Sequence, residues 1–324
     1  MRVPELAELT ADAHVVALPL RTPFRGLNIR ETLLVRGPAG WSEFAPFEEY
    51  DDSEAAEWLR ATIEFGWDQT LTTVRASVPV NATVPAVAPA DVPGMLSQFP
   101  GSMTAKIKVA GTTLDADIAR VGAVRALLGP AGRIRLDANG GWTLDEAERA
   151  IRRLALFDLD YVEQPCETVD ELAELRERIA DTGIAIAADE SVRRASDPLA
   201  VARAGAADLL VLKAAPLGGV RRAEAIIAEA GLPVVVSSAL ESAIGLGLGA
   251  LLAARLEAPE AAGLGTSGLF MTDVAARPVR DGQVSTARLE PDPAALRALA
   301  CAPERREWWL DRLERCLRLV ERSS

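Results

Sequence analysis

Short apolar runs alternate with amphipathic segments along most of this chain. From about residue 104 onward, β-like runs recur, and each is followed by a stretch with apolar residues at helical spacing, as in 144–157 and 169–180. The runs are 104–109, 133–138, 160–164, 184–190, 208–213 and 233–238. Strands that alternate with helices predict right-handed βαβ units and a parallel sheet.

Each of these runs ends on, or next to, a polar residue. These residues are Lys108, Asp137, Glu163, Asp189, Lys213 and Ser238, at separations of 24 to 29 residues. Repeated units with a functional group at the carboxyl end of each strand predict a β/α barrel, whose active site gathers at those ends. Residues 78–86 and 262–270 can supply a first and a last strand, which makes eight. An open doubly wound sheet is the alternative, but it would not bring all six side chains to one centre.

The first part of the chain has a different pattern. Within residues 1–76, short strands are expected at 15–20, 31–36 and 40–45, and a helix at 53–65. Residues 1–76 are therefore expected to form a small α+β domain that covers the mouth of a catalytic barrel formed by residues 77–289. The C-terminal segment 290–324, with a charged helix at 304–321, is expected to pack near the capping domain.

The most apolar stretch, residues 234–254, contains a single charged residue, Glu241. Its length would suit a membrane span. However, it opens with a β-branched run and contains three serines and the alternating glycines 245, 247 and 249. A buried strand followed by a buried helix explains this composition better.

Composition and charge narrow the class of protein. The chain has 324 residues, of which 49% are hydrophobic and 25% charged, a balance typical of a globular protein with a large core. A formal charge of −12 argues against a nucleic-acid-binding face. The N-terminus lacks a signal-peptide pattern, and the three cysteines lie far apart, so a reduced cytoplasmic setting and no membrane partner are expected.

Lysine usage points to chemistry. Of the 35 basic residues only Lys106, Lys108 and Lys213 are lysines. Arginine cannot act as a base near neutral pH, whereas the pKa of a lysine can be lowered by burial or by nearby cations. Lys106 and Lys108 occupy positions i and i+2 of one strand and share a face. We therefore expect each to lower the pKa of the other, leaving one neutral and basic.

Three carboxylates fall on successive strand ends. Asp137, Glu163 and Asp189 come without histidine or cysteine, a set of oxygen ligands that suits Mg²⁺, or Mn²⁺ in its place, and not zinc. A divalent cation bound to a substrate carboxylate acidifies the adjacent carbon and stabilises the enediolate that forms. One lysine would remove the proton and Lys213, across the barrel, could assist. Racemisation, cycloisomerisation and β-elimination all begin in this way.

The motifs that carry these residues resemble the enolase superfamily in its muconate-lactonizing subgroup. They are KIK at 106–108, LDANGGW, VEQP, AADES, LKAAPLGG and SSALES. The resemblance covers the barrel and, more loosely, the capping domain. The FRG loop at 24–26 and the segments SSALESAIG and GLGTSGLF are similar to the o-succinylbenzoate synthase family within that superfamily.

This resemblance implies an enolase-type (β/α)7β modified TIM barrel with a capping domain. It also implies Mg-dependent syn dehydration of 2-succinyl-6-hydroxy-2,4-cyclohexadiene-1-carboxylate to 2-succinylbenzoate, a hydro-lyase step of menaquinone biosynthesis. Lys108 would be the general base, Lys213 would stabilise the enediolate, and Lys106 would tune Lys108 or contact the substrate carboxylate. Asp137, Glu163 and Asp189 would bind Mg²⁺, and the candidate substrate-binding residues are Arg25, Asn139, Ser238, Glu241 and Thr266.

Other reactions on the same barrel are alternatives. The only histidine, His14, lies outside the barrel, which excludes a His–Asp dyad of the mandelate racemase type and a Ser-His-Asp hydrolase. Dipeptide epimerases are expected to carry Asp-x-Asp where this chain reads GLGTSG, so an epimerase is disfavoured. N-succinylamino acid racemase stays open, alone or as a side activity, and muconate cycloisomerase is less favoured.

Two further classes have less support in the sequence. A Schiff-base aldolase would leave the three carboxylates unexplained. A binding module without activity would not need the complete set of lysines and carboxylates. A monomer and a small homo-oligomer are both compatible with the sequence.

Overall fold

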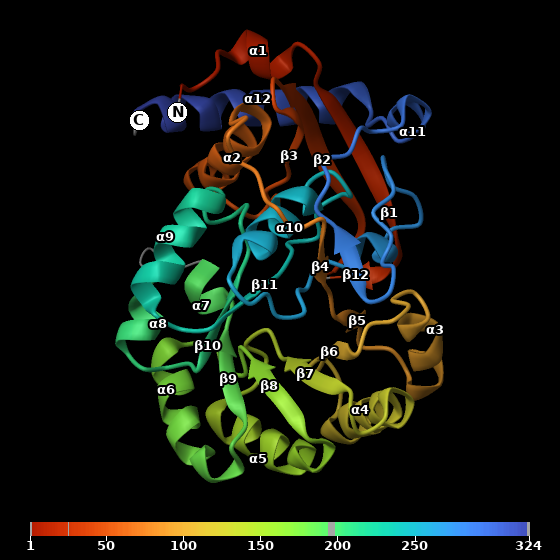
Figure 1. Ribbon diagram of the computed structural model, residues 1–324, viewed down its shortest axis with the longest axis vertical. Coiled ribbons are helices and arrows are strands. Elements are labelled where there is room, and N and C mark those ends of the chain that lie inside the picture. The colour runs from red at the N-terminus through yellow and green to blue at the C-terminus, as the bar shows by residue number, and fades with distance from the viewer. Residues whose placement is uncertain (1, 25, 194–197, 323–324) are drawn as a thin grey trace.

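A parallel sheet forms the lower half of the molecule in a computed structural model that describes residues 2–24, 26–193 and 198–322 (Figure 1). Its seven strands are hydrogen-bonded in the order β11-β10-β9-β8-β7-β6-β5, so neighbours in the sheet are neighbours in the sequence. The strands are β5 (Ala82–Val84), β6 (Thr104–Lys108), β7 (Arg133–Asp137), β8 (Leu159–Glu163), β9 (Ala185–Ala188), β10 (Leu209–Leu212) and β11 (Val234–Val236).

The two edges of this sheet are joined by residues 262 and 263. Parallel bridges connect Ala262 to Val80 and Gly263 to Ser237. The Gly263 N–H donates to the Val236 carbonyl at 2.8 Å on one side, and Ala262 accepts from the Asn81 N–H at 3.0 Å on the other. The sheet is thereby closed into a (β/α)7β barrel, which confirms the predicted fold class.

Helices cover the outside of the barrel, and several of them turn an apolar face toward it. In α5 (Leu144–Leu154) the buried residues Ala147, Ala150, Ile151 and Leu154 recur at helical spacing. The other covering helices are α3 (Val92–Leu96), α4 (Leu114–Leu128), α6 (Val169–Arg178), α7 (Glu190–Arg193), α8 (Ala200–Arg203), α9 (Val220–Ala230) and α10 (Leu246–Arg255).

The apolar stretch 234–254 is part of this core. It forms β11 and then α10, in which residues 246–254 are all buried. The prediction of a buried strand and a buried helix is confirmed. In the ranges that the structure describes, no helix combines the length and the apolar character needed to cross a bilayer.

The expected first and last strands were too long. Residues 78–86 divide into β4 (Ser77–Pro79), which pairs with β12 (Gln283–Ser285), and β5. Pro79 has no N–H to extend the ladder. In 262–270 only the first two residues bridge, and Thr266–Leu269 form a 3₁₀ turn. Gly265 lies against the ring of Phe99, so close that a Cβ would approach it to 2.7 Å.

An antiparallel sheet of three strands and several helices lie above the barrel in Figure 1. They are α1 (Leu6–Thr10), β1 (His14–Phe24), β2 (Leu27–Gly37), β3 (Gly40–Phe44), α2 (Asp52–Trp67), α11 (Pro293–Ala298) and α12 (Pro303–Arg322). Helix α12 lies beside α2, where buried Arg312 donates to the carbonyls of Phe47 and Tyr50 at 3.0 and 2.6 Å. The domain limits at residues 76 and 289 stay predictions.

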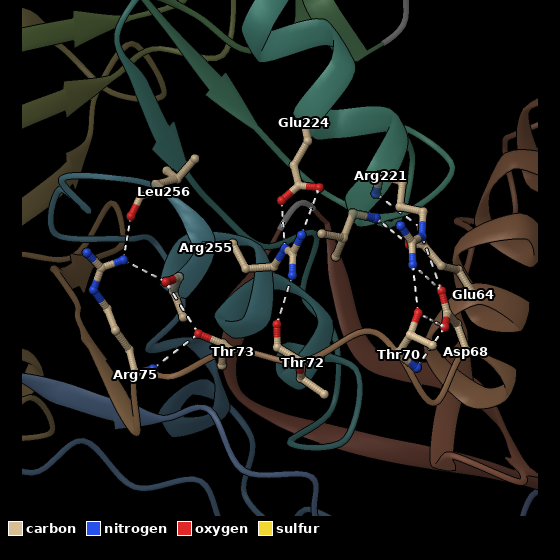
Figure 2. A network of polar contacts seen from close by, with 12 residues as sticks. Glu64, Asp68, Thr70, Thr72, Thr73, Arg75, Arg221, Glu224, Arg255 and Leu256 are labelled. Atoms are coloured by element: carbon tan, nitrogen blue, oxygen red, sulfur yellow. Dashed lines mark hydrogen bonds and ion pairs between the residues drawn. The ribbon is translucent and has the colours of Figure 1, made fainter.

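The end of α2 and the segment after it are bound to the barrel helices (Figure 2). The carboxylate of Glu64 accepts from the backbone N–H groups of Val220 and Arg221 at the start of α9, the second at 3.1 Å. Further along, Arg75 donates to the Ala254 carbonyl at 2.7 Å at the end of α10. These contacts attach the upper part of the molecule to the helices that follow β10 and β11. The Glu64 contact is buried.

Candidate active site

A cavity opens at the carboxyl ends of the barrel strands, where the functional side chains meet. Eight of the residues predicted as catalytic, metal-binding or substrate-binding line it: Lys106, Lys108, Asp137, Asn139, Asp189, Lys213, Ser238 and Thr266. The remaining lining residues are Thr83, Glu190, Ser237, Ala239, Leu240 and Gly263. Glu163 lies behind this wall and is fully buried. Parallel pairing explains the convergence, since the carboxyl ends of all strands lie at one mouth of the barrel.

Lys106 and Lys108 both point into the barrel from β6, as their i and i+2 spacing predicted. Lys106 Nζ lies 2.9 Å from Glu163 Oε1 and 3.1 Å from Asp137 Oδ2. Lys108 Nζ donates to Asp137 Oδ2 at 2.7 Å and to Asn139 Oδ1 at 2.6 Å. The register of the sheet places Lys108 directly beside Asp137 of β7.

The carboxylates, and not the second lysine, dominate the electrostatics of Lys106. Burial alone would lower the pKa of Lys106, but Asp137 and Glu163 hold it well above its usual range. For Lys106 the expectation of a lowered pKa was therefore wrong. Burial would likewise raise the pKa of Asp137, yet the ammonium groups of Lys106 and Lys108 hold it well below its usual range.

On the other side of the cavity, Lys213 donates to Asp189 Oδ2. Strand β10, which ends just before Lys213, is separated from β6 by β7, β8 and β9. Lys213 therefore faces Lys106 and Lys108 across the barrel. Glu163 lies between them on β8, where burial and then the charge of Asp137 raise its pKa to about 8.

The donor set of the site fits a hard divalent cation. Among the described residues, no three acid, histidine or cysteine side chains are arranged so that they could hold a metal ion as they stand. Lysine ammonium groups instead contact Asp137, Glu163 and Asp189. All three acids are buried, and a buried carboxylate needs a positive partner. Oxygen-only ligands at three neighbouring strand ends favour Mg²⁺ or Mn²⁺ over zinc.

Two hydroxyl groups form part of the cavity wall away from the carboxylates. Ser238 follows β11 and its Oγ lies 2.9 Å from Thr266 Oγ1, in the turn after the bridging segment. Both residues line the cavity, as does Asn139. Arg25, the candidate from the capping domain, lies outside the described residues.

Glu241 does not line the cavity. Its carboxylate accepts a hydrogen bond from the Ala239 N–H at 2.7 Å, within the same loop. The geometry therefore assigns it a contact that shapes the loop, in place of the predicted contact with substrate. Burial, with the nearby charge of Glu43 as the next cause, raises the pKa of Glu241 to about 7.

This raised pKa gives the first testable prediction. An acid whose pKa is higher in the folded chain stabilises the fold below the unfolded value near 4.5, and loses that contribution as the pH rises toward 7. Glu241→Gln keeps an oxygen acceptor for Ala239 but carries no charge. At pH 8 the variant should be more stable by on the order of 2 kcal/mol, and at pH 4.5 it should match the wild type. Melting temperatures at both pH values measure this, and equal values at pH 8 would contradict it.

The sequence did not single out several residues of the site. Thr83 on β5, Glu190 and Ser237 line the cavity. Thr83 is a polar residue within the apolar run VPVNATVPA, and this was the signal that could have identified it as a site residue. Gln164 is fully buried, and its Oε1 accepts from the N–H groups of Asp189 and Ser191 at 3.1 and 3.2 Å. It therefore holds the backbone of Asp189 in place.

Comparisons with known proteins agree with this geometry. Residues 100–287 match the family described as enolase C-terminal domain-like, and residues 15–66 match the enolase N-terminal domain-like family. The chain is 53% identical to an o-succinylbenzoate synthase of Mycobacterium marinum over 98% of this chain and 97% of that one. It is 51% identical to an o-succinylbenzoate synthase of Mycolicibacterium smegmatis, over 98% and 99%.

Solved structures show the same fold. The L-Ala-D/L-Glu epimerase from Bacillus subtilis superimposes with a TM-score of 0.71 at 25% identity, over 85% of this chain and 94% of that one. The muconate lactonizing enzyme from Pseudomonas putida gives a TM-score of 0.71 at 21% identity, over 90% and 98%.

Proposed function

This chain belongs to the enolase superfamily and, within it, to the o-succinylbenzoate synthase family, and from that premise we propose the reaction of its cavity. The proposed reaction is the syn dehydration of 2-succinyl-6-hydroxy-2,4-cyclohexadiene-1-carboxylate to 2-succinylbenzoate, a step of menaquinone biosynthesis. The observation that carries the proposal is the convergence of all three lysines with Asp137 and Asp189 on one cavity, with Glu163 buried behind its wall.

Asp137, Glu163 and Asp189 would hold Mg²⁺, for which Mn²⁺ could substitute, with Asn139 close by. When bound, the cation acidifies the proton on the carbon next to the substrate carboxylate and balances the negative charge that develops. The acids come from neighbouring strands β7 and β8 and from the end of β9. Rigid strands hold such a set more precisely than loops do.

Lys108 would act as the general base. Its side chain is 19% exposed, whereas that of Lys106 is 9% exposed and is bound to two carboxylates. As a neutral amine, Lys108 takes the proton from the carbon next to the carboxylate and becomes an ammonium group, a C=C bond forms, and the C–O bond to the hydroxyl group breaks. The same Lys108 returns the proton to the departing hydroxide, so that water leaves on the face from which the proton came.

The remaining side chains bind and orient. Lys213, opposite Lys108, would place a positive charge beside the carboxylate as its negative charge grows. Lys106 would tune Lys108 through their common partner Asp137. The hydroxyl groups of Ser238 and Thr266 would bind the succinyl end of the substrate. Glu241, whose carboxylate binds the Ala239 N–H within its loop, is assigned no contact with the substrate.

One observation favours a second activity, N-succinylamino acid racemisation. Racemisation needs a base on each face of the reacting carbon, and Lys108 and Lys213 face each other across the barrel. The same two lysines could therefore remove a proton from one face and return it to the other.

The proposed setting is the cytoplasm, with a small-molecule carboxylate as substrate and neither nucleic acid nor a membrane as partner. The acidic charge of −12 argues against a nucleic-acid partner. The cytoplasmic setting is supported by Cys166, Cys301 and Cys316, which are all free thiols. A monomer or a small homo-oligomer would both leave the cavity complete within one chain.

The proposal is tested by two assays on the purified protein. Ultraviolet absorbance follows loss of the cyclohexadiene substrate with Mg²⁺ and then with excess EDTA, and polarimetry follows N-succinylamino acids. We expect fast dehydration that EDTA abolishes and Mg²⁺ restores, with slow racemisation or none. Racemisation without dehydration would transfer the assignment to the racemase, and the absence of both activities would overturn the proposal.

A further inference from the structure

Two charged residues on helix α4 bind the backbone around Lys108 from outside the cavity. Asp117 and Arg120 are 1% and 2% exposed, and Arg120 Nη1 lies 2.7 Å from Asp117 Oδ1. Neither residue lines the cavity. A buried ion pair is weak evidence for stability, because apolar residues of similar volume often serve as well. The role of the pair therefore depends on the backbone groups that it contacts.

Arg120 ties together the ends of two neighbouring strands. Its Nη1 donates to the carbonyl oxygen of Lys108 at 2.9 Å, and its Nε donates to the carbonyl oxygen of Val87, beyond β5, at 2.7 Å. The planar guanidinium can make both contacts at once in a fixed geometry. The peptide group that follows Lys108 is thereby held from the side opposite the cavity.

Asp117 holds the turn that comes next. Its Oδ2 accepts from the Ala110 N–H at 3.0 Å and its Oδ1 accepts from Thr112 Oγ1 at 2.7 Å. Ala110 has φ of +67°, a left-handed conformation that a residue with a Cβ adopts only when its surroundings impose it. The pair therefore stabilises a backbone path that the local sequence does not favour, two residues after Lys108.

We propose that Asp117 and Arg120 form a positioning pair that fixes the backbone of Lys108 and so aims its ammonium group at the reacting carbon. The inference rests on the proposed role of Lys108 as the base. Proton transfer is sensitive to geometry, and a displacement of about 1 Å can lower a rate about a hundredfold. Substrate binding depends on other walls of the cavity, so the pair should affect kcat and leave KM nearly unchanged.

Helix α4 offers a matched control for removal of an arginine. Arg125 also binds backbone carbonyls, those of Gly129, Gly132, Phe157 and Asp158, at 2.6 to 3.1 Å. These lie at the other end of the sheet, before β7 and β8. Arg120→Gln should lower kcat at least about tenfold with KM within about twofold of wild type. Arg125→Gln should leave both constants within about twofold.

A second readout does not need turnover. Because the full chain contains only three lysines, protein labelled with ¹³C at lysine Cε gives three NMR signals, which single Lys→Arg variants assign. In the Mg²⁺-loaded protein, Arg120→Gln should move or broaden the Lys108 signal and leave the Lys213 signal in place. Arg125→Gln should leave all three signals in place.

Thr112→Val provides a milder variant if Arg120→Gln does not fold. It removes the hydroxyl that bonds to both members of the pair, at 2.7 and 3.3 Å, without removing a charge. A two- to threefold fall in kcat, smaller than that of Arg120→Gln because the ion pair itself is kept, would support the proposal. An unchanged kcat together with an unchanged Lys108 signal would overturn it. If the wild type shows neither dehydration nor racemisation, the proposed function fails, while the NMR comparison still decides on the pair.

Discussion

Lys108→Ala is expected to lower kcat by roughly 10³- to 10⁴-fold, the contribution of a general base that is aligned with its proton. The alanine variant has no group at this position that could take the proton from carbon or return it to hydroxide. The fold should persist, because Asp137 keeps its contact with Lys106 at 3.1 Å when Lys108 is removed. Turnover of the cyclohexadiene substrate measures the effect, and thermal melting measures the fold.

Arg153→Ala is the control for loss of a positive charge. Arg153 lies on α5 and is 53% exposed, with one ion pair to Asp115 at 3.0 Å. Its removal should leave both kcat and the melting temperature close to the wild type, since exposed ion pairs contribute little. Near-normal turnover in Lys108→Ala would remove Lys108 as the base and transfer that role to another side chain of the cavity.

Glu163→Gln is expected to abolish the response to Mg²⁺. The amide keeps an oxygen for Lys106 but has no charge, and hard cations prefer carboxylate oxygen. We expect the affinity for Mg²⁺ to fall at least about 100-fold and turnover to fall with it. A ligand that binds only the folded state raises the melting temperature, so titration of MgCl₂ against melting temperature measures the loss.

Glu241→Gln is the matched control for this experiment. It makes the same chemical change at another buried glutamate, whose carboxylate binds the Ala239 N–H and not a site lysine. Its melting temperature should still rise with MgCl₂, as that of the wild type should. A full Mg²⁺ response in Glu163→Gln, with normal turnover, would show that Glu163 is not a ligand.

Much of the barrel could be predicted from the sequence because strand periodicity and strand polarity are local properties. The runs around residues 104–109 and 133–138 became β6 and β7 within one residue. A polar residue at the end of a parallel strand must lie at the same mouth of the barrel as its counterparts. The scarcity of lysine then identified which side chains of that mouth to consider.

Side-chain roles that depend on distant partners could not be predicted in this way. The pKa of Lys106 is raised because Asp137 and Glu163, which are distant along the chain, lie 3.1 and 2.9 Å from its ammonium group. Glu241 belongs to a motif of the active-site loop, yet its carboxylate accepts a hydrogen bond from the Ala239 N–H of the same loop. Asp117 and Arg120 lie on the buried face of α4, and the residue pattern alone does not indicate that they contact the backbone around Lys108.

The order of strands and helices and most of the side chains at the barrel mouth could be predicted from periodicity, parallel pairing and residue types, which act over a few positions. The family could be predicted from the resemblance of short motifs. How the charges pair, where the first and last strands stop and which residues hold Lys108 could be learned only from the folded chain. Those outcomes depend on distances between atoms of separate strands, and a difference of a few ångströms decides whether two groups interact.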